Sequence, residues 1–381
     1  MKRFLFNIII LTAAAISAAA QSFSLEQCRG SRMPYPAPDS VVAVPDSLAP
    51  VMIYHVGRHG DRYPTSADKF LQLEASLEAR AAELDPKGAA MLQITRHAID
   101  SIGDRWGQLN DLGVAEQQGI ARRLCMAFPQ LVVGQRISAE SSYVERCVES
   151  MNAFVGVLRH IQAGFGTINT DFGPQFNALL RPFQVDTAYI QWTDSKPYKP
   201  ILEEFSAGIP KSDLDAYYVL SSIGKMDRNI FSLNEFNRLW QVDNLRQYLT
   251  RTHTTISALP AEISAPLLQD IIDRLDAYIA GTETETLRLH FGHAETLMPL
   301  LSLMRLPSCY YLTHYFDTVY SHWQTFNVVP MAANLQVILM RSHSGTYYVR
   351  FDLNERPVDF PGHGTIIPWS TMRTRLLQLL P

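Results

Sequence analysis

The 381-residue sequence is poor in cysteine, in long hydrophobic runs and in net charge. It has four cysteines, and 33 lysines and arginines nearly balance 37 acidic residues, which gives a net charge of −4. After the first twenty residues, no segment is apolar enough to span a bilayer. A mildly acidic chain is not built to bind nucleic acid or an anionic membrane, so a polyanionic ligand would need a local cluster of positive charge.

The first twenty residues have the pattern of a secretory signal peptide. Lys2 and Arg3 form a positive start, and an apolar run follows at 4–16. Three alanines then provide a cleavage site between Ala20 and Gln21. We therefore expect a periplasmic or secreted protein with no membrane anchor. Cleavage would remove two positive charges and move the net charge from −4 to −6.

The cysteines leave two interpretations open. An exported chain with Cys28, Cys125, Cys147 and Cys309 can form one or two disulfides, and two bridges could pair in three ways. The spacings are too wide for a zinc site, and none of the four has a convincing catalytic neighbour. Buried thiols and structural bridges both fit this pattern, and the sequence does not choose among the pairings.

The most informative segment is 58–64, Arg-His-Gly-Asp-Arg-Tyr-Pro, which follows a predicted strand at 51–57. Arg58 and Arg62 offer planar sets of donors that match phosphate oxygens and stay charged at any working pH. Their like charge disfavours the cationic form of His59, which leaves a ring nitrogen free as a nucleophile. This combination predicts attack on a phosphorus atom.

A second junction between a strand and a helix follows. A buried strand is predicted at 131–138, and the next helix, whose apolar residues recur at the helical period, holds Arg146 in its opening turns. Ser142 and Glu145 have the spacing of a capping box at the start of this helix.

A third junction lies near the C-terminus of the chain. A short strand is predicted at 286–291, and Gly292 turns the chain into a helix that opens with His293, Ala294 and Glu295. A hairpin is predicted from 333–340 and 346–353, followed by a short helix at 369–379.

Three buried strands that each lead into a helix predict an α/β fold with a mostly parallel central sheet flanked by helices. Residues 160–285 show short helical patterns and many aromatics, with no alternating strand pattern. We therefore predict a discontinuous core at 21–159 and 286–381, with 160–285 as a mainly helical inserted domain. Ligands of such sheets bind beyond the carboxyl ends of the strands, where all three junctions fall.

The residues at this edge suit the transfer of a phosphoryl group. Three arginines and a histidine can hold the negative charge that metal enzymes hold with a cation, so no cofactor is expected. His59 would attack in line and form a phosphohistidine. An alcohol oxygen is a poor leaving group, and Glu295 is the candidate acid that protonates it.

These motifs resemble the histidine acid phosphatase branch of the histidine phosphatases. The late His-Ala-Glu at 293–295 is similar to that of the multiple inositol polyphosphate phosphatases, including exported bacterial members, whereas acid phosphatases and many phytases have His-Asp there. Residues 106–113 and 335–361 are also similar to family segments. The resemblance covers most of the mature chain and is least secure at 160–285.

The resemblance implies a role for each candidate residue. His59 corresponds to the nucleophile and Glu295 to the proton donor. The phosphate clamp corresponds to Arg58, Arg62, Arg146 and His293. Asp61 departs from the family, where small polar residues are more usual, so we expect it to face away from the phosphate or to influence product release. The implied enzyme is an exported, metal-independent phosphomonoesterase that hydrolyses inositol polyphosphates such as phytate.

Three other interpretations use the same residues. A broad-specificity acid phosphatase would share the pocket, and a phosphate-binding protein without turnover would need neither His59 nor Glu295. A metal site built from His290, His293 and Glu295 is opposed by the arginines, which would repel a cation. The residues that hold the non-reacting phosphates, the inositol position attacked first and the oligomeric state stay open.

Overall fold

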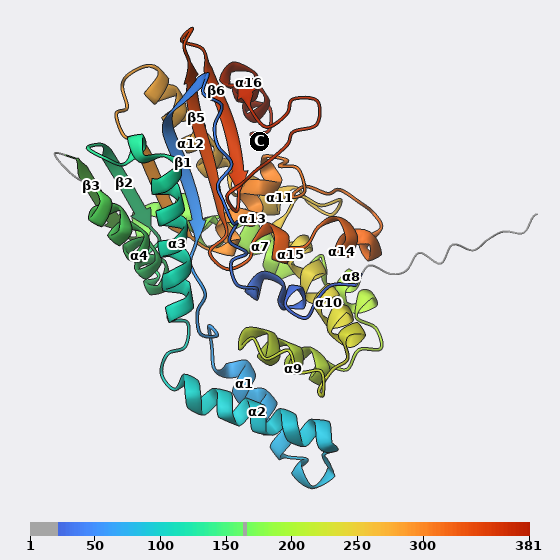
Figure 1. The fold of residues 1–381 in the computed structure, drawn as a ribbon. Coiled ribbons are helices and arrows are strands. Elements are labelled where there is room, and N and C mark those ends of the chain that lie inside the picture. The colour runs from blue at the N-terminus through green and yellow to red at the C-terminus, as the bar shows by residue number, and fades with distance from the viewer. Residues whose placement is uncertain (1–21, 163–165) are drawn as a thin grey trace, which may run out of the picture.

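The computed structural model describes residues 22–162 and 166–381. In this part of the chain, an eight-stranded sheet forms the centre of the fold (Figure 1). Its strands are β1 (Leu48–Arg58), β2 (Arg136–Ser141), β3 (Thr167–Phe172), β4 (Leu287–Gly292), β5 (Asn334–Ser342), β6 (Tyr347–Leu353), β7 (Arg356–Pro357) and β8 (Ile367–Pro368). Across the sheet the order is β3-β2-β4-β1-β5-β6-β7, and β8 pairs with β6.

The sheet is parallel on one side of β1 and antiparallel on the other. β4 pairs in parallel with β1 and β2, and β2 pairs in parallel with β3. β5 runs antiparallel to β1 and forms the predicted hairpin with β6. The predicted α/β class is confirmed. Arg58 is level with Gly292, and Ser141 is level with Phe291, so the loops that follow β1, β2 and β4 meet at one edge.

Two details of the predicted strands are wrong. The strand predicted at 131–138 begins later and is β2, Arg136–Ser141. Residues 129–131 form a 3-10 turn and Gly134 takes a left-handed φ of 72°, so the chain is not extended before Arg136. The strand β3 lies within the segment that showed no strand pattern. It is an edge strand with mostly exposed side chains, so its sequence lacks the apolar alternation of a half-buried strand.

Helices surround the sheet. The α-helices are α1 (Asp68–Glu78), α2 (Pro86–Ile102), α3 (Asp111–Ala127), α4 (Glu145–Ile161), α5 (Asn177–Leu180), α6 (Pro182–Val185), α7 (Thr187–Ser195), α8 (Lys199–Phe205), α9 (Lys211–Ser222), α10 (Leu233–Arg251), α11 (Leu259–Glu262), α12 (Ala265–Ile279), α13 (Ala294–Leu303), α14 (Val319–His322), α15 (Thr325–Val328) and α16 (Trp369–Leu377). Short 3-10 helices are η1 (Gln27–Arg32), η2 (Ala81–Glu83), η3 (Pro129–Leu131), η4 (Pro174–Phe176) and η5 (Phe316–Thr318). No helix in the described ranges is long and apolar enough to cross a membrane.

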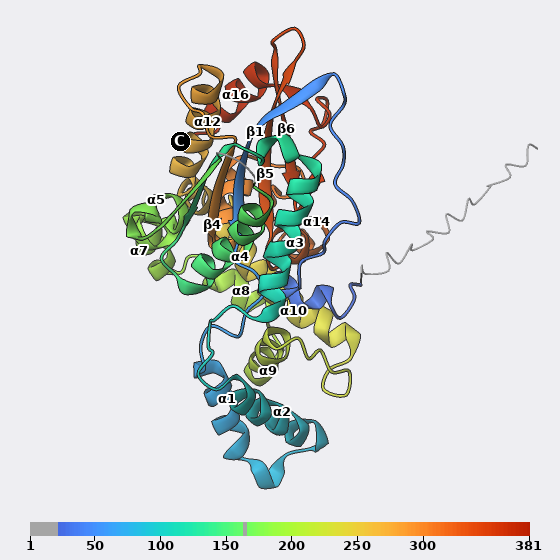
Figure 2. The same cartoon turned by 60° about the vertical axis from the view of Figure 1, so that its left-hand side comes forward.

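The alternation along β1 shows how the two faces of the sheet are covered. Met52 and Tyr54 join a buried cluster with α12, α13 and α16, whereas Ile53 joins another with Leu124 of α3 and Phe154 of α4. Successive side chains of a strand point to opposite faces, so one strand contributes to both clusters. Helices thus cover both faces, as Figure 2 shows from a second side.

A third buried cluster lies beyond the carboxyl ends of the parallel strands. It joins α1, α2, α9 and the first half of α10, in the lower part of Figures 1 and 2. Within 160–285, β3 is a strand of the central sheet and α12 packs on a face of that sheet. Helices α1 and α2, which lie outside 160–285 in the sequence, pack in the third cluster with α9 and α10. The domain boundaries at 160 and 285 stay a prediction. The predicted signal peptide at 1–20 lies outside the described residues.

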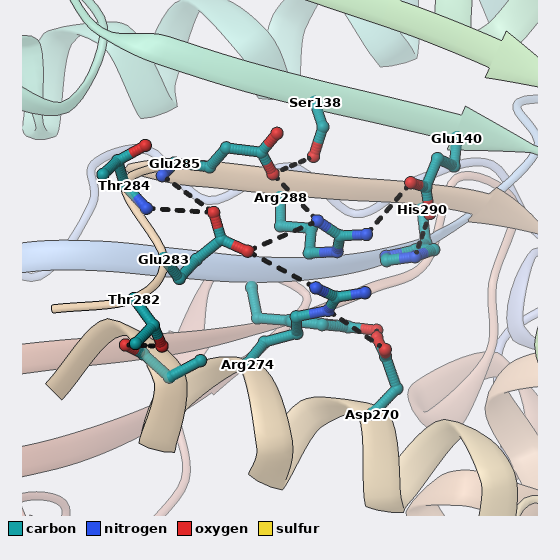
Figure 3. Close-up of polar contacts among 12 residues, drawn as sticks. Ser138, Glu140, Asp270, Arg274, Thr282, Glu283, Thr284, Glu285, Arg288 and His290 are labelled. Atoms are coloured by element: carbon teal, nitrogen blue, oxygen red, sulfur yellow. Dashed lines mark hydrogen bonds and ion pairs between the residues drawn. The ribbon is translucent and has the colours of Figure 1, made fainter. Parts of the chain in front are cut away.

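A group of charged residues, here called the Arg288 cluster, joins β2, β4 and α12 (Figure 3). Its members are Glu140, Asp270, Arg274, Glu283, Glu285 and Arg288. Arg288 lies 3.0 Å from a carboxylate oxygen of Glu140 and 2.8 Å from one of Glu285. Arg274 lies 3.2 Å from Asp270 and 3.4 Å from Glu283. Both guanidinium groups are therefore paired with carboxylates.

The cysteines and one strand histidine have structural surroundings. The cysteines, all described, are buried free thiols: Cys28, Cys125, Cys147 and Cys309. His290 Nε2 lies 2.8 Å from Glu140 Oε2, and its ring stacks on Tyr54. These contacts place His290 with the Arg288 cluster.

Candidate active site

The loop after β1 is held between the sheet and α3. The backbone N–H of His59 donates to the carbonyl of Gly292, and that of Ala332 donates to the carbonyl of His59. At Gly60 the chain passes so close to Gly113 of α3 that an added Cβ would lie 2.3 Å from the Gly113 carbonyl oxygen. Both positions therefore require glycine.

The buried carboxylate of Glu116 holds the same loop through hydrogen bonds. Glu116 of α3 accepts hydrogen bonds of 2.7 Å from the backbone N–H groups of Asp61 and Tyr35, and burial raises the pKa of its carboxyl group to about 7. The Asp61 carboxylate accepts a 3.0 Å hydrogen bond from Asn110, the cap residue of α3. Asp61 thus contacts the helix start that holds the loop in place.

The side chain of Arg58 is buried and fixed by backbone oxygens. Its Nη1 donates to the carbonyls of Ser31, Val329 and Pro330, at 2.5, 2.7 and 3.0 Å. Burial lowers the pKa of Arg58 to about 10, so the group still carries its charge at neutral pH. The three carbonyls use one nitrogen of the guanidinium, which leaves other N–H donors for a ligand.

The contacts of His59 define its tautomer. Nδ1 lies 2.9 Å from the carbonyl oxygen of Gly60, which can only accept, so Nδ1 carries the proton and Nε2 carries the lone pair. Burial, and then the positive charges of Arg146, Arg58 and Arg62, hold the pKa of His59 well below its ordinary value. A neutral imidazole with a free Nε2 is the form that a nucleophile needs.

Two further arginines complete the positive wall. Arg62 donates from Nη1 to the carbonyl of Tyr63, and Arg146 lies in the first turn of α4, as predicted. Burial and the charges of Arg146 and Arg58 lower the pKa of Arg62 to about 9. Among the described residues, no carboxylate lies within 4 Å of the guanidinium groups of Arg58, Arg62 and Arg146. Their positive charge is available to a ligand.

His293 faces His59 across the site, with ring centroids 5.7 Å apart. Arg181 Nη1, which can only donate, lies 3.0 Å from His293 Nε2, so Nδ1 carries the proton of the neutral ring. Burial and Arg146 lower the pKa of His293 to about 3. Nδ1 lies 3.4 Å from Nη2 of Arg146. Two donors therefore face each other, an arrangement that an acceptor oxygen between them would satisfy.

The predicted capping box at Ser142 and Glu145 is wrong. Val144 is the cap residue of α4, and no side chain caps the helix. Ser142 Oγ instead lies 3.1 Å from His293 Nε2. The spacing of a capping box is therefore a coincidence here, because the Ser142 side chain contacts a residue 151 positions away and not the start of its own helix.

Glu295 lies in the first turn of α13, and its side chain is about one-third exposed (35%). Burial raises the pKa of this carboxyl group, but the positive charge of Arg251, with smaller electrostatic contributions from His293 and Arg58, outweighs it and brings the pKa to about 2. Arg251 Nη2 lies 3.6 Å from Glu295 Oε1. Without a ligand, Glu295 is therefore ionised at any ordinary pH.

The six predicted site residues come together around one pocket of about 240 Å³. Arg58, His59, Arg62, Arg146 and Glu295 line it, and His293 contacts Arg146 behind it. Arg32 and Arg246 line the same pocket, whereas Lys196 and Lys199 are exposed and do not. Five arginines line the pocket with Glu295, and Asp243 pairs with Arg32 and Arg246, so the site keeps an excess of positive charge that favours a polyanionic ligand.

Sequence reasoning missed Arg181, Arg251 and Glu116. Arg181 and Arg251 belong to 160–285, where no motif marked them, and they reach the site only because α5, α6 and the end of α10 pack beside α13. Glu116 had a local signal, a carboxylate on the buried face of a predicted helix. Buried carboxylates need a partner, so that pattern could have marked it.

The fold and this group of residues are those of a phosphoric monoester hydrolase, and they resemble the histidine phosphatases. Comparison with known proteins agrees with this class. The family model of the Histidine phosphatase superfamily (branch 2) matches residues 194–354, which include His293 and Glu295. The chain thus resembles branch 2 of this superfamily and, within it, the multiple inositol polyphosphate phosphatases.

The individual relatives are as follows. Multiple inositol polyphosphate phosphatase 1 of Gallus gallus is 27% identical, over 83% of this chain and 79% of its own length. The multiple inositol polyphosphate phosphatase of Bifidobacterium longum, solved with inositol hexasulfate, superposes with a TM-score of 0.77 at 17% identity, over 92% of this chain and 97% of that one. The phytase of D. castellii gives a TM-score of 0.69 at 16% identity, over 93% and 85%.

Proposed function

We propose that this chain is an exported, metal-independent phosphomonoesterase that hydrolyses inositol polyphosphates such as phytate through a phosphohistidine. One observation carries the proposal: the free Nε2 of a neutral His59 opens onto a pocket in which Arg58, Arg62 and Arg146 have no carboxylate within 4 Å among the described residues. The catalytic relatives named above support the same class of reaction.

The proposed clamp would hold the reacting phosphate before any bond changes. Arg58, Arg62 and Arg146 would neutralise its two negative charges, and the Nδ1–H of His293 would donate to a fourth contact. The backbone N–H groups at the start of α13, which lines the pocket through Ala294 and Glu295, favour an anion. These groups stabilise charge on the phosphoryl oxygens as it moves between two atoms.

The proposed reaction has two steps. In the first, the Nε2 lone pair of His59 forms a bond to phosphorus, the bond to the ester oxygen breaks, and Glu295 gives its proton to the departing alcohol. In the second, water attacks the phosphohistidine, Glu295 accepts a proton from that water, and the bond between Nε2 and phosphorus breaks. His59 regains its lone pair, and inorganic phosphate leaves.

Glu295 must gain a proton before it can donate one. Its carboxyl group has a pKa of about 2 in the ligand-free site, and a bound phosphate dianion raises that pKa because two negative charges then lie close together. The acid form is therefore populated mainly in the complex and mainly at acidic pH. With a poor leaving group, turnover should fall as pH rises through the pKa of Glu295 in the complex.

The choice of substrate class rests on charge beyond the clamp. Arg32 and Arg246 line the same pocket and share one carboxylate, that of Asp243 at 3.1 and 2.7 Å, so a second phosphate of a polyphosphate would meet the net positive charge of this group. The inositol hexasulfate bound to the Bifidobacterium longum enzyme is an anion of the same kind. A broad-specificity acid phosphatase, which needs only the clamp, is the competing interpretation.

Phosphate release tests these alternatives. The purified mature chain is assayed on phytate and on p-nitrophenyl phosphate, each with and without EDTA, and the phytate products are separated by ion chromatography. We expect hydrolysis of both substrates, a higher kcat/KM for phytate and no effect of EDTA. Inhibition by EDTA that zinc or magnesium reverses would contradict the metal-independent mechanism. Equal kcat/KM on both substrates would favour the broad phosphatase. The monoester assay is essential because divalent cations can precipitate phytate.

Export is tested separately, because the leader at 1–20 lies outside the described residues. The full-length chain should appear in the periplasm or medium with an N-terminus near Gln21. A chain that stays in the cytoplasm with its first twenty residues intact would contradict export and leave the catalytic proposal unaffected.

A further inference from the structure

The proposed proton donor is contacted by an arginine from a distant part of the chain. Arg251, the last residue of α10, places Nη2 3.6 Å from Oε1 of Glu295. Arg251 is not one of the described residues that line the catalytic pocket. It therefore meets Glu295 without belonging to the phosphate clamp.

The direction of Arg251 is fixed by α7 and its surroundings. Nη1 donates a 2.6 Å hydrogen bond to the hydroxyl of Tyr189, and that hydroxyl donates to the backbone carbonyl of Thr250 at 2.9 Å. The guanidinium carbon also lies 5.6 Å from the ring centroid of Phe183. An arginine held this way keeps its charge beside one carboxylate oxygen, because Nη1 and its flat face are already engaged.

Several charged or titratable groups face Glu295 from the elements around it. They are Arg251 of α10, His293 at the start of α13, Arg58 of β1, Tyr189 of α7 and Cys147 of α4. The His293 ring is neutral in the free protein, and Arg58 is bound to three carbonyls. Arg251 is the cation whose ion pair is with Glu295 itself.

We propose that Arg251 is a positioning residue that holds Oε1 of Glu295 and sets the pH range in which Glu295 can protonate the leaving alcohol. This inference rests on the proposed function of Glu295 as proton donor. A nearby positive charge favours the carboxylate over the carboxylic acid. Removal of Arg251 should therefore let Glu295 keep its proton to a higher pH.

The pH dependence of kcat tests the inference, with phytate and with p-nitrophenyl phosphate. An opposite charge at this distance lowers a carboxyl pKa by about 1 unit or more. For Arg251→Gln with phytate, the alkaline limb should therefore move up by about 1 pH unit. With p-nitrophenyl phosphate the limb should not move, because the phenolate leaves without a proton. Arg251→Lys keeps the charge and should restore most of the wild-type profile.

Two further variants make the test specific. Tyr189→Phe removes the hydroxyl that orients Arg251 and should shift the phytate limb in the same direction by a smaller amount. Arg238→Gln removes an exposed arginine of the same helix and should leave the profile unchanged. If Arg251→Gln does not fold, as judged by circular dichroism and thermal melting, Tyr189→Phe decides the question.

Three results would overturn the inference. These are an unmoved or lowered alkaline limb for Arg251→Gln, the same shift on both substrates, and equal profiles for Arg251→Gln and Arg251→Lys. A wild-type chain that releases no phosphate from either substrate would instead contradict the proposed function. The two failures are therefore distinguishable.

Discussion

Two groups of buried and half-buried arginines in this molecule have opposite surroundings. In the Arg288 cluster, both guanidinium groups contact carboxylates, with separations from 2.8 to 3.4 Å. At the carboxyl edge of the same sheet, Arg58, Arg62 and Arg146 contact backbone carbonyls and a histidine. Burial without neutralisation is costly, so the second group is explained by a ligand that brings the missing negative charge.

The largest expected effect is the loss of activity when the proposed nucleophile beside Arg58, Arg62 and Arg146 is removed. His59→Ala should lose essentially all phosphatase activity and retain less than about 1% of wild-type turnover, because no other imidazole is among the described residues that line the pocket. Rapid alkaline quenching with a labelled substrate should trap an acid-labile phosphoenzyme in the wild type and none in the variant. Substantial turnover by a well-folded variant would remove His59 from the role of nucleophile.

Glu295→Gln tests whether Glu295 donates a proton in the pocket. The amide keeps the size of the side chain but cannot donate a proton at an ordinary pKa. We expect a loss of about 10²–10⁴ in turnover of phytate and a much smaller loss with p-nitrophenyl phosphate. Steady-state rates on both substrates measure the difference. Equal losses would show that Glu295 positions the substrate, and another acid would have to be sought.

Arg288→Met tests the neutralised group. Among the described residues, the change leaves Glu285 without a cation and removes one from Glu140 and Glu283, which keep His290 and Arg274, and this should cost about 3 kcal/mol in free energy of unfolding. Urea denaturation at pH 7 measures this cost. The kcat of the folded fraction should stay close to that of the wild type, since Arg288 is remote from the pocket lining. A stable variant would contradict the structural role of this cluster.

The same variant has a defined pH dependence. In the wild type, the pKa of Glu140 is lowered because hydrogen bonding to His290 and the charges of His290 and Arg288 outweigh its burial. A carboxyl group with a lowered pKa contributes stability above its unfolded pKa and loses it as pH falls through the folded pKa. The difference in free energy of unfolding between wild type and Arg288→Met should therefore become smaller below about pH 4.

Arg62→Met is the matched change at the strand edge, and its expected effect on stability is the smallest. Arg62 is half-buried beside Arg146 and Arg58, so its removal relieves repulsion, and the ligand-free variant should be as stable as wild type or up to about 1 kcal/mol more stable. Thermal melting with inorganic phosphate provides the contrast. Phosphate at a hundredfold excess over Kd should stabilise wild type by about 2.7 kcal/mol and the variant by much less.

A destabilised Arg62→Met protein would contradict the comparison. It would show that Arg62 serves the fold, as Arg288 does, and that its charge is not held for a ligand.

Much of the fold could be predicted because its signals are local. The apolar run that forms β1, the glycine that ends β4 and the hairpin of β5 and β6 each follow from short stretches of sequence. The start of β2 and the existence of β3 could not. The apolar residues 131–133, at and after the end of the 3-10 turn, resemble the start of a buried strand, and an exposed edge strand carries no apolar alternation.

The sequence alone determined the six residues of the candidate site, because three strand ends of a parallel sheet must meet at one edge. Only the tertiary structure decided their chemical states. It placed Ser142 and Arg181 on Nε2 of His293, paired Arg251 with Glu295 and removed water from around His59. Protonation and tautomer depend on what surrounds a ring or carboxyl group in space, and those neighbours come from segments more than a hundred residues away or from an unmarked helix end.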